Sequence, residues 1–177
     1  MIVLSPHSLG PLALALVLAA CSGVNSASNA STGAPSTQTG LPACDVDAAA
    51  PAVPSGGPAV SFVNDVFPII DASCALAPCH GSADHGANQG LYLGSSAASA
   101  WAALVNVPAP ELPSMKFVEP GSPEASYVMH KLDGDQCRFE GACAGSCGAR
   151  MPFGGAQLPG IERDAIRRWI AEGAPQG

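Results

Sequence analysis

The sequence predicts an all-α domain in which short helices are joined by long irregular loops. Apolar residues recur at helical spacing in four separate segments, a pattern typical of helices with one buried face. The stretches between these segments are rich in glycine and proline, and none alternates as a strand does. Only 5% of the 177 residues are aromatic, so the core should be small and should need a staple such as disulfides.

The first helix is expected to begin near Val60 and to run up to Cys74. Pro68 lies inside this segment and should kink or restart the helix, because proline lacks the N–H that a helix interior needs. The apolar positions at helical spacing are Val60, Val63, Val66, Phe67 and Ile70.

A second helix should follow Ser95 or Ser96, either of which can serve as its N-cap, and should carry Trp101 and Leu104. The next segment, "PAPELPSMKFVEPGSP", is broken by prolines and is expected to be irregular. A third, short helix should begin at Ser122 as its N-cap. Its expected inner residues are Tyr127, Val128 and Leu132.

The segment "GIERDAIRRWIAEGAP" predicts the last helix, which should end at Gly173. Its expected apolar face consists of Ile161, Ala165, Ile166, Trp169 and Ile170. The residues expected to face water are Arg163, Arg167 and Glu172.

The N-terminus predicts export. The nine apolar residues Leu12–Ala20 are too few to span a bilayer but suit the core of a signal peptide over 1–20. They end in Leu-Ala-Ala-Cys21, which resembles the lipobox of bacterial lipoproteins, a family in which the cysteine is lipidated after cleavage. The alternative is an ordinary signal peptide cut after an alanine. The lipoprotein interpretation predicts a lipid-anchored protein at the periplasmic face of the cell envelope, with the outer membrane as one possible location.

Residues 21–58 are rich in Ser, Ala, Gly, Thr and Pro and predict a flexible tether. The folded domain should therefore span 59–177. The net charge of −7, with fourteen acids against seven bases, excludes a basic nucleic-acid-binding surface. A solvated acidic surface is expected instead, which is compatible with a basic soluble partner.

The segment "CALAPCH", from Cys74 to His80, is close to the haem-attachment pattern C-x-x-C-H but separates the cysteines by four residues. It could be a stretched haem site, or a small disulfide loop beside an ordinary polar histidine. Residues five apart in a regular helix are rotated by about 140°, so both thiols cannot reach one porphyrin from such a helix. Pro78 disfavours helix at Ala77 and should let the chain loop out.

A haem site of this kind also needs a ligand for the other face of the iron. Met151, in the late loop "GARMPFGG", is favoured because this loop returns between the first and last helices. The other candidates are His85, Met115, Met129 and His130.

These pieces occur in a familiar order. The segments are "VFPIIDASCALAPCHG", "GLYLGSSAASAWAALVN", "VEPGSPEASYVMHKL", "RMPFGG" and "AIRRWIAEGA". From about Val60 to Ala174 the chain resembles a class I c-type cytochrome, and is most similar to exported cytochrome-like domains of myxobacteria and planctomycetes.

The resemblance implies a cytochrome c-like fold whose first and last helices cross and pack together. It implies one haem c joined by thioethers to Cys74 and Cys79, with His80 as the proximal and Met151 as the distal ligand of the iron. Trp169 should pack against the haem or the first helix.

Four cysteines remain when Cys21 is assigned to lipid and Cys74 and Cys79 to haem. They are Cys44, Cys137, Cys143 and Cys147. Two disulfides are favoured over a metal site in an exported protein, although sequence cannot choose among three pairings.

The sequence thus predicts a membrane-anchored monohaem c-type cytochrome that carries electrons for a redox partner protein or respiratory complex and has no catalytic residues of its own. One alternative is a haem-free, disulfide-stapled exported binding or structural module. Another is a haem enzyme or sensor with an open iron site.

Overall fold

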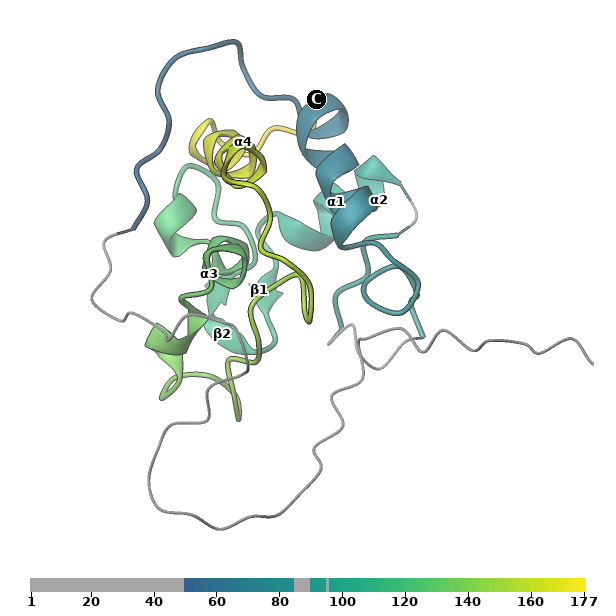
Figure 1. Ribbon diagram of the computed structural model, residues 1–177, viewed down its shortest axis with the longest axis vertical. Helices are drawn as coiled ribbons and strands as arrows, with labels where there is room; N and C mark the ends of the chain where they lie inside the picture. Colours follow the sequence, from purple (N-terminus) through teal and green to yellow (C-terminus); the bar gives the residue numbers. More distant parts are fainter. Residues whose placement is uncertain (1–49, 85–89, 95) are drawn as a thin grey trace, which may run out of the picture.

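A computed structural model describes residues 50–84, 90–94 and 96–177 of the chain (Figure 1). The predicted signal peptide, Cys21 and Cys44 lie outside these residues. The helices are α1 (Phe67–Ser73), α2 (Ala97–Leu104), α3 (Tyr127–Asp133) and α4 (Gly160–Ala171), and the strands are β1 (Pro108–Ala109) and β2 (Leu112–Lys116). None of the helices in these ranges is both long enough and apolar enough to cross a membrane.

The prediction of an all-α fold is wrong, because β1 and β2 form a two-stranded antiparallel sheet in the segment expected to be irregular. Proline cannot continue a helix, but its backbone angles suit an extended chain at the edge of a sheet. Ala109 and Leu112 pair across the hairpin and are buried together with Tyr127 of α3. The hairpin therefore covers a small second cluster of apolar side chains beside the main core.

The first helical segment restarts at Pro68, as the sequence predicts. A π-helical turn, Phe62–Val66, begins after Ser61, whose Oγ accepts a hydrogen bond from the backbone N–H of Asn64 at 3.2 Å. Pro68 then lies in the first turn of α1, where a missing N–H leaves no bond unmade. The helix ends at Ser73, immediately before Cys74.

This first segment packs against α4. The rings of Phe62 and Trp169 lie 4.9 Å apart between centroids, and both side chains are buried. The N–H of Val60 donates to the Glu172 carboxylate at 2.8 Å, which joins the start of the domain to the end of α4. These contacts are those expected between the first and last helices, and one apolar core includes Phe62, Val66, Ile70, Ile166, Trp169 and Ile170 of the two segments.

The expected faces of α4 are partly wrong. Ile161, expected inside, is 81% exposed, whereas Arg167, expected in water, is only 2% exposed. Asp133, the last residue of α3, accepts hydrogen bonds from both Arg163 and Arg167, with the closest Arg167 contact at 3.0 Å. A buried guanidinium needs such a partner, so the position of Asp133 determines which face of α4 turns inward.

The helix expected from Ser122 is also interrupted. A short 3-10 turn, Pro123–Ala125, is followed by an extended residue, Ser126, and α3 begins only at Tyr127. The buried Ser126 hydroxyl accepts from the N–H of Glu119 at 2.9 Å and donates to the carbonyl of Ser122 at 2.8 Å. These bonds compete with helix formation at this residue, as serine side chains often do.

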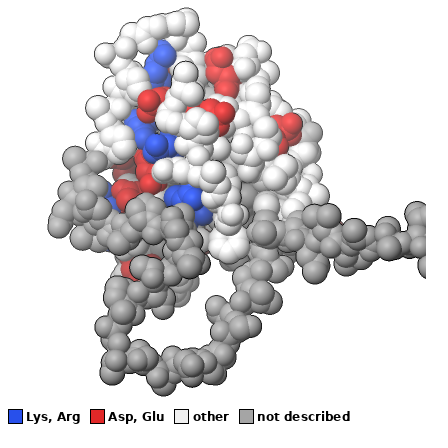
Figure 2. Space-filling model, in the orientation of Figure 1, with Lys and Arg blue, Asp and Glu red and all other residues white. Residues whose placement is uncertain are grey.

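Acidic and basic side chains lie next to one another on the face shown in Figure 2, and a large part of that face carries neither. The ion pairs at the surface include Arg138 with Asp135, Arg168 with Glu172, and Lys116 with Glu119. Exposed pairs of this kind contribute little to stability, typically below about 1 kcal/mol each.

His130 of α3 is a buried histidine whose two ring nitrogens both face acceptors. Nδ1 lies 2.9 Å from the Asp135 carboxylate and Nε2 lies 3.0 Å from the Glu124 carbonyl, while Phe139 packs on the ring edge. Burial lowers the pKa of His130, but the bonds to Asp135 and Glu124 outweigh it and leave the pKa raised. Only the imidazolium can donate to both acceptors.

We therefore expect stability to fall as pH rises from about 6.5 through the raised pKa of His130, because the folded state holds a proton that the unfolded state has released. The slope should approach, and not exceed, about 1.4 kcal/mol per pH unit. Urea unfolding between pH 5.5 and 8.5 measures it. His130→Gln and Asp135→Asn should both reduce this decrease of stability with pH. An unchanged slope in both variants would show that the pKa of His130 is not raised in the folded protein.

Candidate functional site

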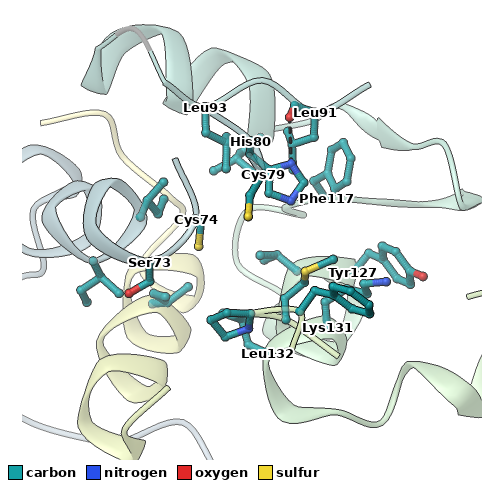
Figure 3. Close-up of a pocket in the computed structure, with 18 of the residues that line it drawn as sticks. Ser73, Cys74, Cys79, His80, Leu91, Leu93, Phe117, Tyr127, Lys131 and Leu132 are labelled. Carbon is teal, nitrogen blue, oxygen red and sulfur yellow. Dashed lines mark hydrogen bonds between the residues drawn. The ribbon is translucent and has the colours of Figure 1, made fainter. Parts of the chain in front are cut away.

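A cavity of about 570 Å³ opens between α1, the loop that follows it, α3 and α4 (Figure 3). Its volume lies within the range of about 300–1,000 Å³ that is usual for sites of small molecules and cofactors. Its walls are mainly apolar. They include Ile69, Ile70, Leu91, Leu93, Leu104, Phe117, Val118, Val128, Leu132, Ile166 and Trp169.

The segment Cys74–Gly81 forms a tight loop at one wall. The carbonyl of Leu76 accepts from the N–H groups of Cys79 and Gly81 at 2.8 and 2.9 Å, and the N–H of His80 donates to the Cys74 carbonyl at 3.1 Å. A side chain at Gly81 would have its Cβ 2.1 Å from the Ala75 carbonyl oxygen, so only glycine fits. The two additional residues between the cysteines are thus taken up by a turn over 77–80.

This loop brings the two cysteines to the same wall. The sulfur atoms of Cys74 and Cys79 both point into the space between His80 on one side and Tyr127, Lys131 and Leu132 on the other (Figure 3). Both are thiols and not halves of a disulfide. Burial, with a smaller effect of the neighbouring Cys79, raises the pKa of Cys74 to about 12. Cys74 is therefore protonated at neutral pH.

His80 is oriented by the chain segment beyond it. Its Nδ1 lies 2.9 Å from the carbonyl of Leu91, and its own carbonyl accepts from the N–H of Leu93 at 2.8 Å. A carbonyl is only an acceptor, so Nδ1 donates in this bond, and Nε2 is the nitrogen that carries the lone pair when the ring is neutral. Histidines that bind a metal typically donate their other N–H in this way.

Met151 reaches the same cavity from the loop after α3. Its backbone N–H donates to the carbonyl of Lys131 at 2.8 Å, and the guanidinium of Arg150 donates to the Gly155 carbonyl at 2.9 Å and closes the loop. Lys131 lies across the cavity from His80 in Figure 3. The structure therefore brings Cys74, Cys79, His80 and Met151 to one cavity.

Of the other candidates for the distal ligand, the three that the structure describes do not line this cavity. Met129 and His130 are buried elsewhere in α3, and Met115 packs at the second apolar cluster. His85 lies outside the described residues. Within the described ranges, no group of three or more His, Cys, Asp or Glu side chains is arranged to hold a metal ion.

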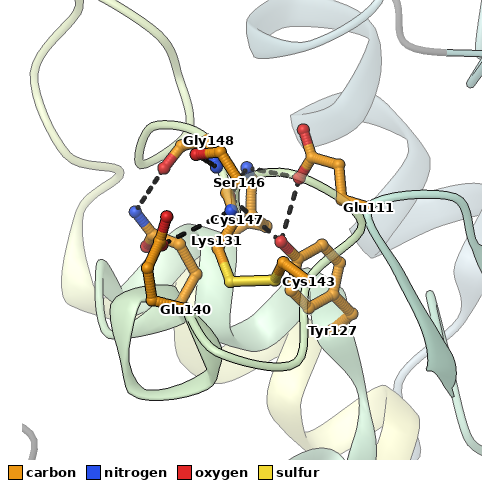
Figure 4. The surroundings of a disulfide bond; sticks show 9 residues. Glu111, Tyr127, Lys131, Glu140, Cys143, Ser146, Cys147 and Gly148 are labelled. Carbon is orange, nitrogen blue, oxygen red and sulfur yellow. Dashed lines mark hydrogen bonds and ion pairs between the residues drawn. A yellow bond between two sulfur atoms is a disulfide. The ribbon is translucent and has the colours of Figure 1, made fainter.

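The segment "CRFEGACAGSC" contains disulfide-bonded cysteines (Figure 4). Cys143 and Cys147 are joined, with 5.3 Å between their Cα atoms. Cys137 is also disulfide-bonded. The predicted disulfide candidate Cys44 lies outside the described residues. Cys147 is buried, and its carbonyl lies 2.8 Å from the ammonium of Lys131. The Cys143–Cys147 disulfide therefore lies beside Lys131, which lines the cavity, and Cys143 packs against the second apolar cluster.

Glu111, Tyr127 and Lys131 are polar residues at this end of the cavity. The sequence predicted Tyr127 only as an inner residue of the third helix, and it did not point to Glu111 or Lys131. A signal for Lys131 was available, because Val128, Lys131 and Leu132 share one face of α3 by helical spacing. No comparable signal exists for Glu111, since its approach to α3 depends on the hairpin. No family model, curated protein or solved structure matches this chain.

The environment of Cys74 predicts slow alkylation. A rise in pKa from 9.0 to about 12 lowers the thiolate fraction roughly a thousandfold, and the greater nucleophilicity of a more basic thiolate restores part of this loss. In Cys79→Ser protein, iodoacetamide at pH 8 should label Cys74 about 30-fold more slowly than in the same protein unfolded in urea. Peptide mass spectrometry measures both rates, and equal rates would show that Cys74 is not desolvated.

Proposed function

We propose that this chain is an exported, lipid-anchored monohaem c-type cytochrome that carries electrons in the bacterial cell envelope. The observation that carries the proposal is the placement of two thiols, a histidine and a methionine around one apolar cavity. These are the groups needed to attach a haem c covalently and to ligate its iron on both faces.

The donor set fits the group. Cys74 and Cys79 would hold the haem through thioethers, which require thiols and not a disulfide. His80 would be the proximal ligand, with Nε2 available because Nδ1 is directed to the Leu91 carbonyl. Met151 would be the distal ligand, carried by a loop that is bonded to α3.

Haem ligated by histidine and methionine supplies one-electron transfer at a relatively high potential, with no open iron position for a substrate. The chain's own residues hold and shield it. The Leu91 carbonyl fixes the orientation of the His80 ring, and the Lys131 carbonyl fixes the backbone of Met151. Trp169 and the aliphatic side chains of the walls exclude water, which favours a carrier over an enzyme.

The haem-free alternative, a stapled binding or structural module, requires a disulfide between Cys74 and Cys79. The thiol state of both residues favours haem instead. Lipid anchoring through Cys21 and a redox protein or respiratory complex as partner belong to the same proposal.

Protein expressed together with cytochrome c maturation machinery should be coloured and should contain one haem per chain. A pyridine haemochrome spectrum measures this content, and haem retained on denaturing gels shows that the link is covalent. In the Cys74→Ser/Cys79→Ser double variant, haem should become extractable because both thioethers are lost. Colourless wild-type protein would exclude both the carrier and a haem enzyme.

Met151→Ala should remove the charge-transfer band of a methionine–iron bond while changing haem content little, because the thioethers and His80 remain. Met115→Ala is the matched control, since Met115 is a partly buried methionine that does not line the cavity. Its band should be unaffected. A band that survives in Met151→Ala would assign the distal position to another residue or leave it open.

A further inference from the structure

One end of the cavity carries a buried ammonium group. Lys131 of α3 is only 6% exposed, and its Nζ lies 2.8 Å from both Glu111 Oε2 and the carbonyl of Cys147 (Figure 4). The same Nζ lies 5.6 Å from the centre of the Tyr127 ring. A lysine this buried is rare, and desolvating its charge is costly unless anionic or carbonyl oxygens surround it.

The Glu111 carboxylate that pairs with this ammonium also binds the Tyr127 hydroxyl. Glu111 Oε2 accepts from the Tyr127 hydroxyl at 2.9 Å as well as from Lys131, and the hydroxyl also lies 3.0 Å from the Cys147 carbonyl. Burial and the neighbouring Glu111 raise the pKa of Tyr127, so the phenol stays protonated and remains a donor. Two donors therefore converge at the polar end of an otherwise apolar cavity.

The backbone leaves space beside the ammonium. Gly148 lines the cavity with a φ of +62°, and a Cβ placed there would lie 3.1 Å from Lys131 Nζ and 3.0 Å from Glu111 Oε1. An ammonium has three N–H donors, and among the described residues Glu111 and the Cys147 carbonyl account for two of them. The absence of a side chain at Gly148 keeps the approach to the third donor open.

We propose that Lys131, with Glu111, Tyr127 and Gly148 around it, forms the carboxylate-binding end of the cavity and receives an acid side group of the porphyrin. The inference rests on the proposed haem function and deepens it. A porphyrin of the haem type has an apolar body and two propionate groups, which matches an apolar cavity with one cationic end. In the haem-free chain the ammonium is paired with Glu111. The Glu111 side chain is 21% exposed, so it can turn toward water when a propionate replaces it as the partner of Lys131.

Binding of iron-free porphyrin to the haem-free full chain, with its thiols kept reduced, tests this without any electron-transfer assay. Mesoporphyrin IX has ethyl groups in place of vinyl groups, so it cannot form thioethers, and its dimethyl ester lacks both carboxylates. With both probes delivered from the same detergent micelles, the diacid should bind about tenfold or more tightly than the diester, as expected for a charge-assisted hydrogen bond.

Lys131→Met should reduce this preference to below about threefold, since the methionine keeps the apolar stem but has no charge. Lys116→Met is the matched control, because Lys116 lies outside the cavity and pairs with Glu119 at the surface. The control should keep the full preference. Circular dichroism of both variants reports whether they fold.

A second variant keeps the test decisive if Lys131→Met is unfolded. Glu111→Gln removes the competing carboxylate and should raise the affinity for the diacid without changing that for the diester. A purely structural ion pair predicts instead that both affinities fall together, which would overturn the inference. Equal binding of diacid and diester by the wild-type chain, or binding of neither, would also overturn it while leaving the haem proposal standing. That proposal is tested separately, by the haem content of protein made with the maturation machinery.

Discussion

The contact between Phe62 and Trp169 determines where the walls of the cavity lie. It holds the π-helical turn that precedes α1 against α4, so that α1 ends with Cys74 beside the space that Trp169 closes from the other direction. Trp169 is at once a core residue and a wall of the cavity. Because the core is small, removing this ring would leave a void that the few neighbouring aromatic side chains could not fill.

Interactions between residues close in sequence allow the ends of several helices to be predicted. Ser96 caps α2 by accepting the N–H of Ser99 at 3.2 Å, Pro68 restarts the first helix, and Gly173 ends α4 with a positive φ. The failures have two causes. The burial of Arg167 depends on Asp133, which is distant along the chain, and helical periodicity within one segment does not reveal that partner. The β1–β2 hairpin and the break at Ser126 depend on local pairings that helical periodicity also does not reveal.

The same division holds for the candidate site. Cys74, Cys79 and His80 lie close together in the sequence, and Met151 is in a short loop with a distinctive composition. Residue type and order therefore suffice to predict them as site residues. Lys131 and Glu111 were missed because their relation is spatial. Twenty residues separate them, and they meet only because the hairpin turn places Glu111 beside α3.

Lys131 contacts both the loop that carries Met151 and the polar end of the cavity, and it uses different atoms for the two. Its carbonyl accepts the N–H of Met151, whereas its ammonium faces Glu111 and the Cys147 carbonyl. The loop that carries Met151 has little regular structure, so this backbone bond and the Cys143–Cys147 disulfide do much to fix its course. The ammonium also bonds the Cys147 carbonyl, four residues before Met151, so Lys131 contacts the loop at two points. A charge that the fold must desolvate is stable only with such oxygen partners, and here they come from the hairpin and from the loop that carries Met151.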